Sequence, residues 1–265
     1  MRIMSDEQNP DEVVDLPEEI APGLRLAHNP QPEPAEGAHR RRRGQHDPLA
    51  ALRQWTPRTR LGRMVRSGQI LTIEQAFETG LPIREVEIVD ALLPGLEDEV
   101  VNVNMIQRMT DSGRRVRFNV MAAVGNEDGY VGLAICKGKE VAGTIRKAID
   151  TAKLSVIPVM RGNGSWESGG GAGTSIPFKV KGRAASTRVT LMPAPAGKGL
   201  VIGEKGRIVL RLAGITDIYS RTDGQTRTTI NFAKATFNAL KMLNKSKVSE
   251  EQKKRLYMTS GRLHS

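Results

Sequence analysis

The chain has little of several residue types on which secreted proteins, metalloproteins and enzymes depend. It holds one cysteine among 265 residues, Cys136, which excludes an intramolecular disulfide, so a reduced, cytoplasmic location is expected. The four histidines are scattered without the spacing of a zinc site, and we expect no metal. No apolar run reaches the roughly 18 residues of a membrane-spanning helix, and the acidic, proline-rich start lacks the pattern of a signal peptide. These absences argue against a membrane partner, a disulfide scaffold and a metal centre.

The sequence also lacks a recognisable catalytic arrangement. No Ser/His/Asp set, Cys/His pair or pair of carboxylates stands out as suited to acid–base or nucleophilic catalysis. We therefore predict a binding or structural protein with no catalytic residues and no cofactor, and not an enzyme.

Positive charge is what the chain has in excess, and it is unevenly distributed. The formal net charge is +11, although residues 1–38 contain nine carboxylates against two arginines. Residues 54–265 therefore carry a formal charge of +14. A region this basic favours a polyanionic partner, and nucleic acid is favoured over an anionic membrane because no membrane-directed segment is found.

Composition divides the chain into five segments. Residues 1–53 are rich in Pro and Glu, contain no aromatic residue and are predicted to be a disordered extension. Residues 54–160 and 175–244 show periodic apolar patterns and are predicted to be two α+β domains. A glycine-rich linker at 161–174 joins them, and a basic tail follows at 245–265.

The first domain is predicted to follow the order helix, strand, strand, strand, helix. Its elements are expected at 72–77 and 84–93 (helices), 100–110, 115–124 and 130–137 (strands), and Val141 to Ala152 (helix). Turn residues at 111–113 and 126–129 separate the strands. This is the order of a double-stranded-RNA-binding domain, which recognises A-form RNA by its shape.

The two most periodic elements of this domain both carry outward cations. In the second strand, one face holds Val116, Phe118, Val120, Ala122 and Val124, and the other holds Arg115, Arg117 and Asn119. In the helix, the side away from the apolar stripe holds Lys139, Arg146, Lys147 and Lys153. The pattern predicts a surface that binds phosphates, and the alternative is an ordinary solvated basic face.

The second domain is predicted to alternate strands and helices. They are expected at 175–182 and 188–192 (strands), 205–213 (helix), 215–220 (strand) and 230–243 (helix). The tail is expected to be helical from Ser249, because Ser249 and Gln252 have the spacing of a capping box.

Two glycine motifs in this domain allow alternative interpretations. Gly203–Gly206 matches the GxxG loop of KH domains, which clamps a nucleic-acid backbone, but a proline-rich loop precedes it where KH topology requires a helix. We prefer a helix start whose glycines allow tight packing. Residues 193–206 resemble a phosphate-binding loop without the Ser or Thr that would position magnesium, so a nucleotide-dependent enzyme is disfavoured.

Ordered segments across residues 55–243 match one protein family. They include WTPRTRLGRMV at 55–65, QRMTDSGRRVRF at 107–118, LMPAPAGKGLV at 191–201 and TRTTINFAKATFNALK at 226–241. Through these segments the chain resembles the universal ribosomal protein five of the small subunit, in its archaeal form. The long acidic extension departs from the family pattern.

The resemblance implies a function in translation. Family members bind small-subunit ribosomal RNA, line the path by which messenger RNA enters, influence decoding accuracy and contact ribosomal proteins four and eight. It also implies a non-catalytic second domain, whose fold is shared with GHMP-type kinases and contains a left-handed βαβ crossover. The alternatives are a free KH-like RNA-binding regulator and a GHMP-type nucleotide-dependent kinase.

The resemblance also assigns candidate contact residues, centred on the hairpin at 110–117. The RNA-binding candidates are Thr110, Arg114, Arg115, Arg117, Lys137 and Lys139, to which the cationic side of the helix adds Arg146 and Lys147. The residues implied to pack toward ribosomal protein four are Ser186, Thr187 and Arg188.

Overall fold

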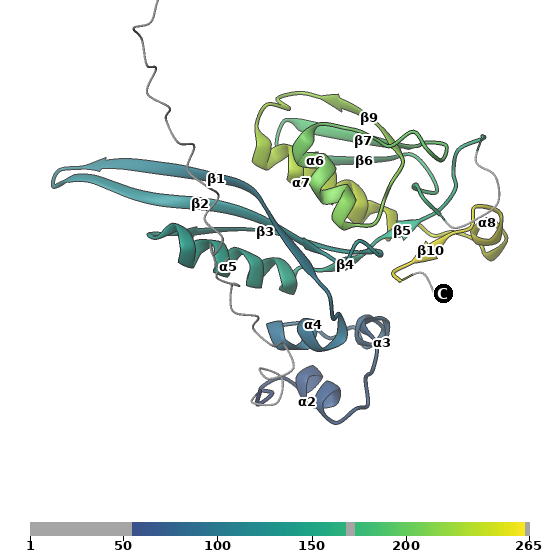
Figure 1. The fold of residues 1–265 in the computed structure, drawn as a ribbon, viewed down its shortest axis with the longest axis horizontal. Coiled ribbons are helices and arrows are strands. Elements are labelled where there is room, and N and C mark those ends of the chain that lie inside the picture. The colour runs from purple at the N-terminus through teal and green to yellow at the C-terminus, as the bar shows by residue number, and fades with distance from the viewer. Residues whose placement is uncertain (1–54, 168–172, 263–265) are drawn as a thin grey trace, which may run out of the picture. The chain divides into compact units, whose positions relative to one another are not determined.

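The computed structural model describes residues 55–167 and 173–262 (Figure 1). The predicted extension at 1–53 and residues 168–172 of the predicted linker lie outside the described residues. The described chain contains three short N-terminal helices, a first sheet with one helix packed on it, and a second sheet with two helices packed on it. The predicted α+β class is therefore confirmed.

The N-terminal helices are α2 (Arg60–Arg66), α3 (Ile73–Glu78) and α4 (Val86–Leu92). Helix α3 begins where the sequence predicts, because Thr72 and Gln75 form a capping box. Helix α2 was not predicted, since arginines dominate its sequence. Its apolar residue Leu61 is nevertheless buried and packs in one cluster with Ile70 and Ile88.

Glu85 holds the start of this helical group together. Its carboxylate accepts hydrogen bonds from the backbone N–H groups of Arg58 (2.9 Å) and Thr59 (2.6 Å) and from the indole Nε1 of Trp55 (2.9 Å). Partial burial opposes ionisation, but these hydrogen bonds prevail and lower the pKa of Glu85 below its ordinary value.

The first sheet has the strand order β1–β2–β3–β4, with all neighbours antiparallel. Its strands are β1 (Glu97–Thr110), β2 (Gly113–Gly125), β3 (Tyr130–Gly138) and β4 (Ile157–Pro158). Helix α5 (Val141–Leu154) follows β3 and packs on β2 and β3. The predicted helix–strand–strand–strand–helix order is confirmed, as is the turn at 126–129, where Asn126 Oδ1 accepts from the N–H groups of Asp128 and Tyr130.

Both faces of the first sheet are buried over much of β2, which the sequence pattern did not predict. Val120 and Ala122 pack toward α5, as their alternation indicates. Met121 and Ala123 face the other way and belong to the core of the second sheet and its helices. Asn119, predicted to face outward with the arginines, is only 9% exposed. The outward face is therefore open to solvent only in the part of the hairpin before Asn119.

The second sheet has the order β6–β7–β9–β8, and α6 and α7 lie along one face of it (Figure 1). Its elements are β6 (Val180–Ala184), β7 (Thr187–Pro193), β8 (Leu200–Val201), α6 (Glu204–Leu212), β9 (Ile218–Asp223) and α7 (Thr229–Leu243). Strand β8 is parallel to β9, so β8, α6 and β9 form one βαβ unit. The core joins the second sheet and its helices to the inner face of the first sheet, through side chains such as Leu191, Leu212 and Leu240.

Two predicted strands are displaced toward the C-terminus. The strand expected at 175–182 begins at Val180, because the buried Ser175 instead bridges to Gly162 and accepts a hydrogen bond from the Ala194 N–H. The strand expected at 215–220 begins at Ile218, and Asp217 just before it accepts from the Gly199 N–H at 2.8 Å.

The GxxG segment is a helix start, as the preferred interpretation states. Gly203 is the N-cap of α6. A Cβ on Gly206 would lie 2.8 Å from Ile202 Cδ1 and 3.0 Å from Phe232 Cε1, so a larger residue here would require these two side chains to shift. The glycines serve packing within the domain.

The basic tail folds back onto the domain connection. Helix α8 (Glu250–Arg255) begins at the predicted capping box of Ser249 and Gln252. Beyond it, β10 (Thr259–Ser260) pairs with β5 (Met160–Arg161). None of the helices between residues 55 and 262 that the structure describes is long and apolar enough to cross a membrane.

Candidate nucleic-acid interface

The β1–β2 hairpin extends beyond the rest of the first sheet (Figure 1). Strand β3 pairs with β2 only from Phe118 to Gly125. Residues 106–117 therefore form a two-stranded ribbon, which lacks a third strand among the described residues. At its tip the Thr110 hydroxyl donates to the Gly113 carbonyl at 2.8 Å, and Gly113 adopts a φ of +113°. Thr110 thus closes the turn that positions the flanking arginines.

The ribbon has one cationic face, which we define as Arg108, Arg115 and Arg117. Directly opposite residues of an antiparallel pair share a face of the sheet. Arg108 lies opposite Arg115, and Arg117 lies opposite Ile106 and two residues from Arg115. All three arginines are exposed. Like charges directly opposite each other destabilise a strand pair, so this face is better suited to an anionic partner than to solvent alone.

Lys137 extends the cationic face onto the third strand. It lies opposite Asn119 of β2, whereas its neighbour Cys136 points toward α5. Arg146 and Lys147 are exposed on α5, which packs on the opposite side of the sheet, and the exposed Lys139 lies two residues before that helix begins. The predicted single surface is therefore divided into two, one on each side of the sheet.

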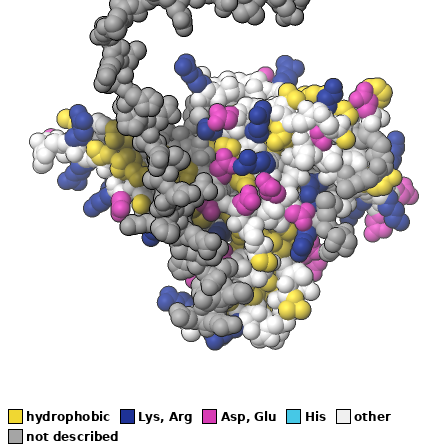
Figure 2. All heavy atoms as spheres, in the orientation of Figure 1, with side chains coloured by type: hydrophobic (Ala, Val, Ile, Leu, Met, Phe, Trp, Pro, Cys, Tyr) yellow, Lys and Arg dark blue, Asp and Glu magenta, His cyan; other side chains and the backbone are white. Residues whose placement is uncertain are grey.

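Arg114 lies on the other face of the ribbon, opposite Met109. This face is unexpectedly apolar at its surface: Met109 is 71% exposed, Met105 57% and Val103 43%. Figure 2 shows hydrophobic side chains among Lys and Arg side chains at the hairpin, on the left of the view. The alternation of apolar residues over 100–110 predicts a strand, but it does not indicate that one face stays uncovered.

The cationic face lacks neutralising partners of its own. No ion pair joins Arg108, Arg115, Arg117 or Lys137 to a carboxylate within the described residues. Lys153, which the sequence placed on the free cationic side of the helix, differs: its Nζ lies 2.6 Å from Asp90 Oδ1 of α4. Lys153 therefore serves to join two helices.

Arg108 is the one member of the cationic face that sequence reasoning missed. Its pairing follows from the turn, because a two-residue loop at Asp111 and Ser112 puts Arg108 opposite Arg115. Counting outward from the predicted turn would have found it.

The candidate protein-contact residues lie at the β6–β7 turn. Ser186 and Arg188 are exposed there, and Ala185 adopts a φ of +53°, which is strained for a residue other than glycine. Thr187 is completely buried and its hydroxyl donates to the Gln225 carbonyl at 2.9 Å. Thr187 can therefore hold the turn in place but presents no side chain to a partner.

The carboxylates and the cysteine within the described residues include no group of three or more that could hold a metal ion.

Comparison with known proteins places the chain among two-domain ribosomal proteins. The family model described as ribosomal protein S5, N-terminal domain, matches residues 96–160, which contain the first sheet. The model described as ribosomal protein S5, C-terminal domain, matches residues 182–255, which contain most of the second sheet and its helices.

Individual relatives agree with these matches. The chain is 55% identical over 209 residues to small ribosomal subunit protein uS5 of Methanothermobacter thermautotrophicus, covering 79% of this chain and 97% of that protein. It is 54% identical over 196 residues to the protein of the same name from Halobacterium salinarum, covering 74% and 92%. The chain belongs to the ribosomal protein S5 family, as the resemblance predicts.

Membership of this family shows that the protein is not an enzyme. Ribosomal protein S5 is a structural, non-enzymatic component of the small subunit, so the chain is not a kinase and its glycine-rich loop is not a catalytic site. The KH-like alternative is set aside on the same ground.

Proposed function

We propose that this protein is a structural constituent of the cytoplasmic small ribosomal subunit that binds small-subunit ribosomal RNA through the cationic face of its hairpin. The supporting observation is the group of Arg108, Arg115, Arg117 and Lys137, exposed on one face without neutralising carboxylates among the described residues. Guanidinium groups form paired hydrogen bonds with phosphate oxygens, and neutralising phosphates releases condensed counterions.

The second group of cations serves the same RNA from the other side of the sheet. Arg114, Lys139, Arg146 and Lys147 are exposed and contact phosphates there. Thr110 contributes by closing the turn. Contacts of this kind position the protein on folded RNA without reading its sequence.

The family resemblance extends the proposal to partners. The protein lies near the messenger RNA entrance and influences decoding accuracy, and its neighbours are ribosomal proteins four and eight. The exposed Ser186 and Arg188, with Thr187 supporting their turn, contact protein four.

The finer fold assignment belongs to the same proposal. Residues 54–160 form a double-stranded-RNA-binding-type domain, supported by the order of α4, the three strands and α5. Residues 175–244 form the second domain, in which the crossover from β8 through α6 to β9 is left-handed, as the family resemblance implies. The parallel pairing of β8 with β9 supports the crossover itself. Residues 161–174 are the linker and 245–265 the tail.

Charge reversal tests the RNA interface. The variant Arg115→Glu/Arg117→Glu should fail to join small subunits when the tagged full chain is expressed in a host with this type of ribosome, because repulsion replaces two phosphate contacts. Sedimentation at increasing salt measures the retained fraction, and thermal unfolding checks that the variant is folded.

The matched control is Lys253→Glu/Lys254→Glu, which reverses two exposed cations of α8. It should be retained like the unchanged protein. Equal retention of the hairpin variant and the control would show that the cationic face does not bind ribosomal RNA.

A further inference from the structure

A cavity of about 580 Å³ lies where the N-terminal helices, the β2–β3 turn and the C-terminal tail meet. Part of its lining is apolar: Ile73 and Leu93 are buried there, and Leu71 is 75% exposed. The polar part of the lining includes Glu74 and Asp128. A cavity of this size, with apolar walls and a few polar groups, is typical of small-molecule sites. We name it the acidic cavity.

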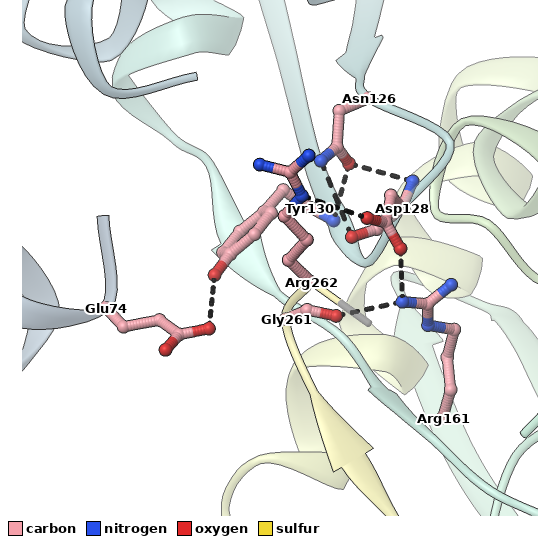
Figure 3. A network of polar contacts seen from close by, with 7 residues as sticks. All are labelled: Glu74, Asn126, Asp128, Tyr130, Arg161, Gly261 and Arg262. Atoms are coloured by element: carbon pink, nitrogen blue, oxygen red, sulfur yellow. Dashed lines mark hydrogen bonds and ion pairs between the residues drawn. The ribbon is translucent and has the colours of Figure 1, made fainter. Parts of the chain in front are cut away.

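The two carboxylates of the acidic cavity lie apart from each other. Figure 3 shows Glu74 at the hydroxyl end of Tyr130 and Asp128 in the turn from which Tyr130 starts. Glu74 Oε1 accepts a hydrogen bond from the Tyr130 hydroxyl at 3.1 Å. Burial raises the pKa of Tyr130, and the charges of Glu74 and Asp128 raise it further, so negative potential from both carboxylates acts at this hydroxyl.

The negative charge of the cavity is only partly neutralised. Glu74 forms no ion pair with a Lys or Arg side chain in residues 55–167 and 173–262. Asp128 Oδ1 is held by Arg161 at 2.7 Å. At Asp128 Oδ2 the contact with Arg262 Nε is 3.7 Å long and the Arg262 side chain is 75% exposed, so solvent weakens this pair. A cationic ligand would therefore gain attraction at Glu74 and could replace Arg262 at Asp128.

We propose that the acidic cavity binds a linear polyamine. One ammonium group of the ligand lies at Glu74 and another at Asp128 Oδ2. The alkyl chain between them packs on the apolar lining at Leu71, Ile73 and Leu93.

The arrangement of charges favours a polyamine over other cations. A divalent metal ion needs several oxygen ligands close together, and the described residues contain no group of three or more that could hold one. A hydrated inorganic ion gains nothing from the apolar lining, and a monoamine reaches only one carboxylate. Ammonium groups joined by short alkyl chains satisfy both carboxylates and remove apolar surface from water.

The test measures the binding of radiolabelled spermidine to the full-length protein by equilibrium dialysis without RNA. At physiological salt, screening limits repulsion from the basic remainder of the chain to roughly 8 Å. The unchanged protein should bind a single spermidine at saturation. Glu74→Gln should raise the Kd about tenfold, because the amide keeps an acceptor for the Tyr130 hydroxyl but removes the charge.

Two further variants make the test specific to the cavity. The control Glu78→Gln removes an exposed carboxylate of the same helix, α3, outside the cavity lining, and should leave the Kd unchanged. Leu71→Ser removes an exposed apolar side chain from the lining and should weaken binding severalfold without affecting folding. Spermidine should also raise the Tm of the unchanged protein and of Glu78→Gln more than that of Glu74→Gln.

The remaining outcomes would overturn the inference. If Glu78→Gln weakens binding as much as Glu74→Gln, diffuse surface charge holds the spermidine. Equal affinity for butylamine or Mg²⁺ would exclude a ligand that spans two carboxylates. Binding of a lysine-rich peptide without binding of spermidine would make the cavity a protein-docking site. Arg115→Glu/Arg117→Glu should bind spermidine like the unchanged protein, so each of these results is independent of the proposed RNA interface.

Discussion

The buried guanidinium of Arg161 donates to Asp128 Oδ1 at 2.7 Å, joining β5 to the turn between β2 and β3 (Figure 3). The same Nη2 donates to the Gly261 carbonyl at 2.9 Å. One side chain thus holds three segments that are far apart in sequence. Arg161 is only 3% exposed, so its charge depends on these two acceptors for compensation.

Removing the Asp128 carboxylate should destabilise the protein, because the buried Arg161 charge then loses one of its two acceptors. Asp128→Ala should lower the free energy of unfolding by about 2 kcal/mol, less than for a fully buried ion pair because the Asp128 side chain is 32% exposed. Urea unfolding measures the loss. Asp98→Ala, which removes an exposed carboxylate of β1, should change stability little, and similar losses for the two variants would contradict the role given to Asp128.

Tyr130 is expected to make stability fall at alkaline pH. Its hydroxyl lies 3.1 Å from Glu74 Oε1, and burial together with the Glu74 charge raises the pKa of Tyr130 above its ordinary value. Because the folded state holds this proton more tightly, its contribution is complete below about pH 10, the pKa of an unfolded tyrosine, and is lost as the pH rises further.

Two measurements check this expectation. At a pH where free tyrosine is ionised, ultraviolet titration should show that part of the tyrosine of the folded protein is still protonated. In Tyr130→Phe, all remaining tyrosines should be ionised at that pH. Tyr130→Phe should also cost about 1 kcal/mol at neutral pH through the lost hydrogen bond. Complete tyrosinate formation in the folded protein at that pH would refute the prediction.

Glu85 is expected to make stability fall at acidic pH. Its pKa is lowered in the folded state, so its contribution is complete above the ordinary value near 4.5 and is lost as the pH falls through the lowered value. Glu85→Gln should therefore reduce the Tm at neutral pH, and the difference from the unchanged protein should shrink on acidification. A difference independent of pH would mean that the carboxylate charge is unimportant there.

Replacing glycine by alanine should change the free energy of unfolding in opposite directions at Gly182 and Gly143. A Cβ on Gly182 would lie 2.1 Å from the Ala235 carbonyl and 2.4 Å from the Ala239 N–H nitrogen, so Gly182→Ala should push β6 off α7 and cost several kcal/mol, by analogy with an overpacked core. Gly143 lies in α5, where a Cβ would meet only Glu140 Oε2 at 3.8 Å. Gly143→Ala should stabilise the protein by about 0.5 to 1 kcal/mol. Chemical denaturation measures both, and a stable Gly182→Ala variant would contradict the close packing of β6 and α7.

Local patterns predicted those elements whose boundaries are set locally. The turn at 111–113 fixes the hairpin register, and the Ser249–Gln252 spacing fixes the start of α8. The face of the sheet that holds Arg115 and Arg117 follows from simple alternation.

Local sequence patterns did not predict the features that depend on contacts between distant segments. Met121 and Ala123 are buried because the second sheet and its helices pack there, and no periodicity within β2 signals that partner. Thr187 is buried by the loop after β9, although its neighbours Ser186 and Arg188 are exposed. Strand β10 has two residues and exists only because β5 is available to pair with it.

The alternation of the ribbon restricts how the hairpin can change length during evolution. Its turn connects Thr110 to Gly113. If one residue is added to each strand between the sheet and the tip, every side chain beyond the insertion moves to the opposite face of the ribbon. One inserted pair would turn Arg115 and its partner Arg108 to the apolar side, whereas two pairs would restore them. Insertions and deletions between the tip and the sheet should therefore survive in steps of two residues per strand, and hairpins of odd difference should carry their arginines at shifted positions.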